Sequence, residues 1–405
     1  MERVGLTASS PTEQFLNESL ENRSKLKLGT PTLIPWNEQL PGFSNIVPGM
    51  VRGDLCIVTG ISGIGKSRVG RKLALKDIRA YCESKSIKLK VFINSIEESA
   101  SKLVGTFVAQ EAHSTFGMDL TYYEAINFRK SNPSDKDMNS IISCTKAVDK
   151  KYFANNLLNI ETETNPFNFY KKVRDYLFEV GTFYYIHRDT KGRETARDII
   201  TRKAITKGNF TNYIYSGAWN HYKYHEPTLV VTIFDTINKA TGYVENLGGV
   251  KNTLSQYDSI SRYVHHYAAV LLGKIHGCIN FVVAQQKGEQ NIIETNFTGK
   301  TVLEKLKPNL GALASNKSMD QSATLILGLF NPLKYGTKKY EGYEDIHKLK
   351  GGYLSMLFMK SREGAIPYPA NEVPLITNFA IDDFVQLPPP DMLRQEEIYK
   401  KYYKH

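Results

Sequence analysis

The sequence is poor in cysteine and has no long apolar segment. Its 405 residues include 4 cysteines, Cys56, Cys82, Cys144 and Cys278, which are far apart and form no C-x-x-C pair. This spacing predicts reduced, buried thiols and argues against a disulfide framework or a zinc site. No stretch approaches the roughly 20 apolar residues of a membrane span, and the N-terminal segment lacks the apolar core of a secretion signal. We therefore expect a cytoplasmic protein without a membrane contact.

Acidic residues are outnumbered by basic ones. The chain has 52 lysines and arginines against 41 aspartates and glutamates, which gives a net charge of +11. Such an excess favours a polyanionic partner, with nucleic acid as the first candidate. A lysine-rich, solvated surface explains the excess equally well, so charge alone does not decide between the two.

Short apolar, β-branched runs recur along the chain and predict strands. They cover residues 55–60, 90–96, 228–236, 279–286, 324–330, 353–361 and 374–381. Several are apolar throughout, which is typical of strands that are covered on both faces. Helical patterns at about 74–82 and 253–276 alternate with the early strands. This order predicts an α/β fold with a mostly parallel central sheet flanked by helices, and with antiparallel strands at one edge.

The chain divides into a tail, a large domain and a second tail. Residues 1–30 are polar, but a helix-capping pattern at Ser10 predicts either a short docking helix or a frayed tail. The domain covers 31–385, and residues 386–405 form a basic C-terminal tail. Within the domain, about 181–226 reads as an insertion of two aromatic strands flanking a basic helix. Its aromatic residues predict the core of a small β appendage, with a base-stacking surface as the alternative; they are Tyr184, Tyr185, Tyr213, Tyr215, Trp219, Tyr222 and Tyr224.

One motif carries chemistry by itself. The segment GISGIGKS matches the pattern G-x-x-x-x-G-K-[ST], and it lies between a predicted buried strand and a predicted amphipathic helix. Glycines let successive backbone N–H groups face a phosphate, and the start of the helix adds its positive end. Lys66 is expected to reach the β- and γ-phosphates of ATP, and Ser67 to bind Mg²⁺. The predicted nucleotide-binding residues are Gly60, Ile61, Ser62, Gly63, Ile64, Gly65, Lys66, Ser67 and Arg68.

Hydrolysis requires two further groups, a carboxylate near the Mg²⁺ ion and a base for the attacking water. Asp235 ends an apolar run and is the predicted metal carboxylate. Glu97 follows the run at 90–96, on the sheet edge where the phosphate loop is expected, and is the predicted base. Glu98 is the second choice for the base. A carboxylate that merely stabilises a helix N-terminus is the alternative interpretation of Glu97.

The order of these segments resembles the RecA-like ATPases, and especially the DnaB-type replicative helicases, from about residue 30 to 385. GMVRGDLCIVTG resembles the segment that leads into their phosphate loop, and NSIEESASKLVGTFVA resembles the segment that carries their catalytic glutamate, here Glu97. VVAQQ resembles the strand that ends in a glutamine sensing the γ-phosphate, here Gln285. LFMKSREG resembles the segment that reaches a neighbouring subunit's ATP site, which implies that Lys360 and Arg362 act there. The resemblance implies a RecA-like P-loop NTPase fold.

Two segments are candidates for contact with DNA. The loop 238–252 is rich in glycine and carries Lys239 and Lys251, while KPNLGALASNKSMDQ resembles the family's DNA loop and carries Lys317. The family's usual arginine-glutamate-serine-glycine run is replaced by Ala-Ser-Asn-Lys, which puts the DNA contact there in doubt. The family's large N-terminal helical domain has no counterpart in this sequence, so a reduced helicase of viral or mobile-element type is implied.

We interpret the sequence as an ATP- and Mg²⁺-dependent helicase that forms a homo-oligomeric ring, expected to be a hexamer, on single-stranded DNA. The resemblance implies 5′–3′ unwinding at replication forks, with a primase or a helicase loader as further partners. A RecA-like recombinase or a KaiC-like regulatory ATPase would share the same chemistry. A nucleotide-gated assembly protein that never moves along DNA is the alternative from a different class.

Overall fold

The computed structural model describes residues 33–118, 120, 135–188, 194–198, 221–245, 251–286, 306–311, 313, 317–344, 346–349, 352–362, 366 and 370–390. The predicted N-terminal tail at 1–30 lies outside the described residues. Of the C-terminal tail, only residues 386–390 are described.

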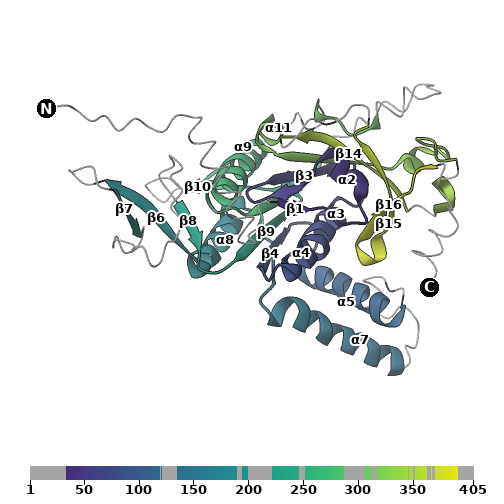
Figure 1. The fold of residues 1–405 in the computed structure, drawn as a ribbon, viewed down its shortest axis with the longest axis horizontal. Coiled ribbons are helices and arrows are strands. Elements are labelled where there is room, and N and C mark those ends of the chain that lie inside the picture. The colour runs from purple at the N-terminus through teal and green to yellow at the C-terminus, as the bar shows by residue number, and fades with distance from the viewer. Residues whose placement is uncertain are drawn as a thin grey trace.

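A large mixed sheet forms the centre of the molecule (Figure 1). In spatial order its nine described strands are β16 (Asp383–Gln386), β15 (Glu372–Asn378), β14 (Tyr353–Ser361), β13 (Leu325–Phe330), β3 (Leu55–Gly60), β12 (Ile279–Gln285), β9 (Thr228–Asp235), β4 (Lys88–Ser95) and β5 (Leu158–Glu161). The strands from β13 to β5 run parallel to one another. Strands β14, β15 and β16 continue the sheet antiparallel. This arrangement confirms the predicted fold class.

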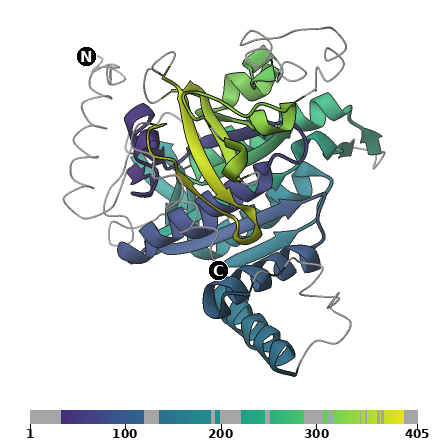
Figure 2. The same cartoon turned by 90° about the vertical axis from the view of Figure 1, so that its right-hand side faces the viewer.

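Helices cover both faces of the sheet. On one face lie α2 (Pro41–Ile46), α3 (Lys66–Lys72), η1 (Leu73–Ile78), α4 (Arg79–Ser84), α5 (Ala100–Phe116), α7 (Asp135–Val148) and η2 (Asp149–Ala154). On the other face lie α8 (Pro166–Val180), α9 (Gln256–Ser261), η5 (Arg262–Ile275) and α11 (Lys317–Ser322). Helices α5 and α7 form a pair that extends away from the sheet in both views (Figures 1 and 2).

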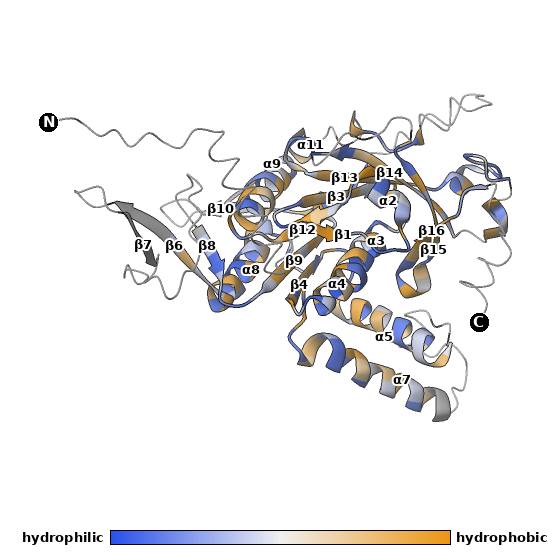
Figure 3. Cartoon of the chain, viewed as in Figure 1, coloured by the Kyte–Doolittle hydropathy of each residue, from blue (hydrophilic) through white to orange (hydrophobic). Residues whose placement is uncertain are grey.

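The two-sided cover explains why the strands are apolar throughout. In β9, Val231 and Ile233 pack into the core on one face, whereas Val230 and Phe234 pack into the core on the other. Successive side chains of a strand point to opposite faces, so a strand between two helical layers has no solvent side. Hydrophobic residues are accordingly concentrated in the central strands (Figure 3).

A third apolar cluster lies beside the antiparallel strands. It includes Phe330, Tyr353 and Ile376, and it covers the short segments η8 (Pro332–Tyr335) and η9 (Ile346–Leu349). A further turn, η10 (Phe379–Ile381), joins β15 to β16. The strands β1 (Leu33–Pro35) and β2 (Gly49–Val51) form a separate antiparallel pair.

The insertion differs from its prediction. It contains a three-stranded antiparallel sheet in the order β7 (Glu194–Asp198), β6 (Gly181–Arg188), β8 (His221–Tyr224), which projects from the end of the molecule opposite β15 and β16 (Figure 1). The expected basic helix is wrong over β7, because the backbone there pairs with the free edge of β6. Tyr213, Tyr215 and Trp219 lie outside the described residues.

The root of the insertion is an aromatic core. The Tyr222 ring lies 4.8 Å from the ring of Phe183 and 5.0 Å from that of His276, and its hydroxyl donates a hydrogen bond to Leu177 O over 2.8 Å. The Tyr224 hydroxyl donates to His276 O over 2.9 Å. Burial lowers the pKa of His276 to about 4, so this imidazole is neutral near pH 7. These aromatic side chains therefore attach the appendage to the core.

Two expectations from the composition can be compared with the structure. All four cysteines are buried and free, as predicted. In the part of the chain that the structure describes, no helix has both the length and the apolarity needed to cross a bilayer.

Candidate nucleotide-binding site

The segment Gly60–Ser67, called the phosphate loop below, connects the end of β3 to the start of α3 at the carboxyl edge of the parallel strands. Gly60 and Gly65 have φ angles of 154° and 96°, which favour glycine. A Cβ atom at Gly60 would lie 2.8 Å from Leu329 O, and one at Gly65 would lie 2.3 Å from the Phe379 ring. Larger residues at either position would therefore push the loop away from the elements beneath it.

Lys66 is held inside the phosphate loop. Its side chain is buried, and Nζ donates a hydrogen bond to Ile61 O over 2.7 Å. Burial lowers the pKa of Lys66 to about 8, although the nearby carboxylates of Asp235 and Glu97 act in the opposite direction. A buried ammonium group with a carbonyl partner loses much of its hydration, and an anion in the loop would compensate for that loss. The geometry thus suits a phosphate group.

Ser67 and Asp235 meet at the first turn of α3. The Ser67 hydroxyl donates to Asp235 Oδ1 over 2.9 Å, and the Thr236 hydroxyl donates to the same oxygen over 3.1 Å. Burial raises the pKa of the Asp235 carboxyl group, and the hydrogen bond from Ser67 acts against this rise. A serine hydroxyl beside a carboxylate supplies the hard oxygen ligands that Mg²⁺ prefers. These two residues fit the predicted metal site.

Glu97 lies two residues beyond the end of β4 and is exposed. Its Oε1 atom lies 3.2 Å from Nζ of Lys239. Glu98 has other partners, because its carboxylate lies 3.4 Å from Arg71 and 2.9 Å from Lys102. The helix that follows is capped by Ser99, whose hydroxyl accepts a hydrogen bond from the N–H of Lys102. Glu97 is therefore outside the helix, and it is the carboxylate of this pair whose charge acts on Lys66.

Gln285 ends β12 directly beside the phosphate loop. It is the register partner of Gly60 in the neighbouring strand, and its side chain is exposed. Its backbone N–H donates to Asn238 Oδ1 over 2.6 Å. The next residue, Gln286, is buried and donates its N–H to Gly60 O over 3.2 Å. The structure thus places the predicted γ-phosphate sensor at the edge of the loop.

Within one chain, Lys360 and Arg362 lie far from the phosphate loop. The Lys360 ammonium group lies 3.2 Å from Asp320 Oδ1, and the Arg362 guanidinium group donates to Gln321 O. Ser361, between them, is paired with Leu325, which is level with Cys56 near the start of β3. Four residues of strand therefore separate this position from Gly60, a distance of roughly 13 Å.

The three predicted DNA-contacting lysines occupy different elements. Lys239 ends η4 (Ile237–Lys239) and pairs with Glu97, as described above. Lys251 begins β11 (Lys251–Thr253), which pairs with β10 (Tyr243–Glu245) to form a hairpin. Lys317 begins α11. The hairpin tip at 246–250 and the residues immediately before Lys317 lie outside the described residues.

Two residues of the loop environment are not evident from the sequence pattern. Nζ of Lys334, in η8, donates to Ser62 O over 3.2 Å and to Gly63 O over 3.0 Å. Arg68 was predicted to bind the nucleotide, but its guanidinium group lies over the Phe379 ring, 5.4 Å from the centroid, and donates to Phe379 O. Lys334 follows a buried strand that neighbours β3, and this position at the carboxyl edge of the sheet was the available indication.

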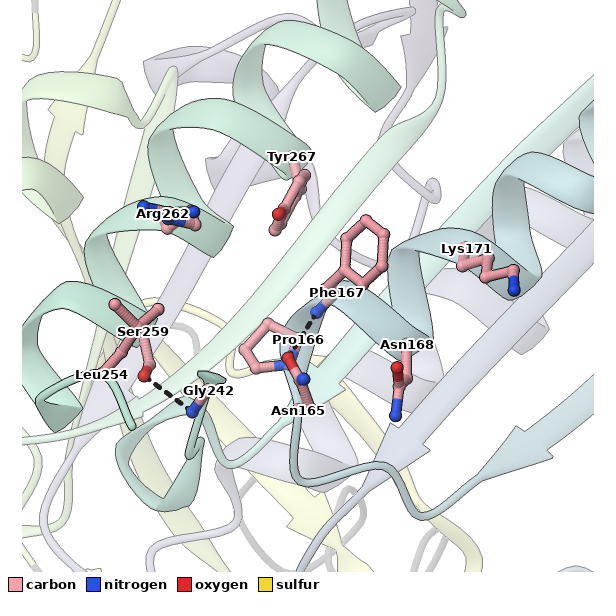
Figure 4. A pocket seen from close by; sticks show the side chains of 10 residues that line it. All are labelled: Asn165, Pro166, Phe167, Asn168, Lys171, Gly242, Leu254, Ser259, Arg262 and Tyr267. Carbon is pink, nitrogen blue, oxygen red and sulfur yellow. Dashed lines mark hydrogen bonds between the residues drawn. The ribbon is translucent and has the colours of Figure 1, made fainter. Parts of the chain in front are cut away.

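A cleft of about 450 Å³ lies at the root of the β10–β11 hairpin (Figure 4). It is lined by Asn165, Pro166, Phe167, Asn168, Lys171, Gly242, Leu254, Ser259, Arg262 and Tyr267. The N–H of Gly242 donates to Ser259 Oγ over 2.8 Å, and the N–H of Thr241 donates to Thr164 O over 2.9 Å. These bonds fix the root of the hairpin between α8 and α9.

The fold has counterparts among solved structures. An ATPase domain, solved on its own, aligns with a TM-score of 0.54 and 13% sequence identity, over 92% of this chain and 99% of that chain. A DnaB-like replicative helicase, in a structure that also concerns its interactions with primase, aligns with a TM-score of 0.54 and 12% identity, over 94% of this chain and 72% of that chain. A KaiC-like protein from Pyrococcus horikoshii aligns with a TM-score of only 0.42 and 13% identity, over 88% of this chain and 100% of that chain.

The comparisons with sequences give no further relatives. No protein-family model and no curated protein matches the chain. The structural likeness confirms the predicted RecA-like fold, of the kind found in the ATPase domains of DnaB-like helicases. At these identities, the likeness concerns the fold alone.

Proposed function

We propose that this protein is an ATP-dependent DNA translocase of the DnaB type, which assembles as a ring and unwinds duplex DNA by moving along a single strand. The observation that carries the proposal is the convergence of Lys66, Ser67, Asp235, Glu97 and Gln285 at one edge of the sheet. These residues come from four strand ends and supply the groups that phosphoryl transfer to water requires.

Each residue has a role in hydrolysis. The glycine amides and Lys66 hold the phosphates, while Ser67 and Asp235 hold Mg²⁺, which neutralises charge on the β- and γ-phosphates when it is bound. Glu97 accepts a proton from the water that attacks the γ-phosphorus atom, as the bond to the ADP oxygen breaks. Gln285 reports the presence of the γ-phosphate through the backbone of its strand. In this assignment every step uses a residue at the carboxyl edge.

The proposed arginine finger belongs to a different subunit from the phosphate loop that it serves. Arg362 lies at the opposite end of the strands that neighbour β3, so it can serve only a phosphate loop in another subunit. A planar, permanently charged guanidinium group suits the charge that develops on a transferring phosphoryl group. Lys360 and Arg362 would then complete the site of the next subunit, which makes hydrolysis depend on assembly.

Unwinding of a forked DNA duplex tests the proposal. We expect the wild-type protein to separate the strands in the presence of ATP and Mg²⁺, and the Lys66→Ala variant to fail. Electron micrographs with ATP and single-stranded DNA should show closed rings. Helical filaments would indicate a recombinase instead, and an ATPase that ignores DNA and separates no strands would indicate an assembly protein.

A further inference from the structure

The residue predicted to contact DNA and the residue predicted to activate water form an ion pair. Nζ of Lys239 lies 3.2 Å from Oε1 of Glu97. We propose that Lys239 is a positioning residue that restrains Glu97 until single-stranded DNA binds, so that the pair links occupancy of the DNA site to hydrolysis. This inference deepens the proposed function and rests on its assignment of Glu97 as the base.

The two residues extend from neighbouring strand ends. Ser95, near the end of β4, is the register partner of Asp235 at the end of β9, and the N–H of Ile96 donates to Asp235 O over 2.7 Å. Glu97 follows the first strand, and Lys239 follows the second through the single turn of η4. The pair therefore spans the same strand ends that hold the proposed metal carboxylate.

The restraint acts on the lone pairs that catalysis needs. A general base must accept a hydrogen bond from the attacking water, and a carboxylate oxygen that already faces an ammonium group is a weaker acceptor for that water. With Lys239 removed from the pair, Glu97 can turn fully toward the phosphate loop, where its charge already acts on Lys66. The basal rate should therefore be low while the pair is intact.

The pair is weak enough to be exchanged. The side chains of Lys239 and Glu97 are 56% and 40% exposed, and ion pairs of such exposure contribute little to stability. A phosphodiester of single-stranded DNA offers the ammonium group an alternative anion in the same solvent-exposed setting. Binding of DNA can thus separate the pair without unfolding any element.

The backbone around Lys239 connects it to other parts of the site. The N–H of Lys239 donates to Thr236 O over 3.1 Å, next to Asp235. Its neighbour Asn238 receives the N–H of Gln285, and Asn238 O accepts a hydrogen bond from the Gln256 side chain. The turn that carries Lys239 therefore touches the predicted sensor strand on one side and the start of α9 on the other.

ATP hydrolysis by the full-length chain, measured at saturating ATP with and without single-stranded DNA, tests the inference. We expect Lys239→Ala to raise the rate without DNA about two- to fivefold, as expected from the loss of one exposed ion pair, and to reduce the stimulation by DNA. Lys239→Arg retains the positive charge and should restore the low basal rate. Lys88→Ala removes a comparably exposed pair with Glu226, at the other end of β4, and should change neither rate.

The basal rate separates the possible outcomes. An unchanged or reduced basal rate in Lys239→Ala would overturn the inference, even if stimulation by DNA were lost, because Lys239 would then be only a DNA contact. High salt screens exposed pairs, so the difference between wild type and Lys239→Ala should shrink at roughly 0.5 M salt. A wild-type protein that ignores DNA would refute the proposed function, whereas the effect of Lys239→Ala on the basal rate would still measure the restraint.

Discussion

The guanidinium group of Arg71 lies 2.7 Å from the carboxylate of Asp382, and both side chains are buried. Arg71 belongs to the helix that follows the phosphate loop, and Asp382 lies in the turn between β15 and β16. Burial opposes the charge of Arg71, but Asp382 and Glu98 outweigh it and hold the pKa of Arg71 above its usual value. The pair therefore ties the antiparallel edge of the sheet to the nucleotide site.

We expect Asp382→Asn to destabilise the protein strongly. The substitution leaves a buried guanidinium charge without its main partner, which typically costs about 3–5 kcal/mol of the free energy of unfolding. Urea denaturation followed by circular dichroism measures this change. As a control, Glu83→Gln breaks the exposed pair with Arg79 and should cost less than about 1 kcal/mol. Equal effects of the two substitutions would mean that burial does not distinguish the pairs.

The Glu97→Gln variant should bind ATP but not hydrolyse it. An amide of the same shape cannot accept the proton of the attacking water, and loss of a general base typically lowers turnover by about 10²–10⁴-fold. Phosphate release measures turnover, and a fluorescent ATP analogue measures binding. Glu98→Gln serves as the matched control, because Glu98 pairs with Arg71 and Lys102 instead. Loss of turnover in the control alone would move the base to Glu98.

The sheet could be predicted because its information is local. Each strand shows an apolar run, and the phosphate loop is a contiguous motif that follows one of these runs. The positions of Lys334 and Asp382 could not be predicted in this way. Lys334 contacts Ser62 at a sequence separation of 272 residues, and Asp382 contacts Arg71 at a separation of 311. Only the assembled sheet brings such residues together.

The insertion was mispredicted for a related reason. The segment Glu194–Asp198 contains glutamate, alanine and arginine, which favour helices in isolation. In the structure it pairs with β6 instead, from Tyr184 opposite Asp198 to Arg188 opposite Glu194. Pairing with an available strand edge outweighed the intrinsic preference of these residues.

Lys334→Ala should weaken the binding of ATP. The Lys334 ammonium group holds the carbonyl groups of Ser62 and Gly63, and its removal lets the phosphate loop lose the conformation that presents its N–H groups. Hydrogen bonds from a charged group contribute about 1.5–3 kcal/mol, so we expect a loss of affinity of at least tenfold. Fluorescence titration with an ATP analogue measures it. Lys338→Ala, at an exposed position four residues further on, is the control, and an equal loss there would indicate a general effect of charge.

Arg362→Ala should bind ATP normally and yet fail to hydrolyse it. Arginine fingers contribute about 10³-fold or more to turnover, whereas they do not hold the nucleotide in the absence of the transition state. Mixing this variant with Glu97→Gln tests whether the arginine acts between subunits. In mixed rings, some sites combine an intact Glu97 with a neighbour's intact Arg362, so two inactive proteins should recover activity together. No recovery, after mixed assembly has been verified, would show that Arg362 does not act in trans.

ATP binding should weaken as the pH rises through about 8. Burial lowers the pKa of Lys66 to about 8, so roughly nine-tenths of the free protein carries the ammonium charge at pH 7 and only about a tenth carries it at pH 9. The triphosphate favours the protonated form and raises this pKa on binding, so the free protein must take up a proton above pH 8. The dissociation constant should therefore be flat below pH 7 and increase by up to about tenfold per pH unit above pH 8. Isothermal titration calorimetry in buffers of different ionisation enthalpy measures both the affinity and the proton uptake. Lys66→Arg keeps its charge at pH 9 and should show no such rise; a rise of equal size in that variant would assign the titration to another group.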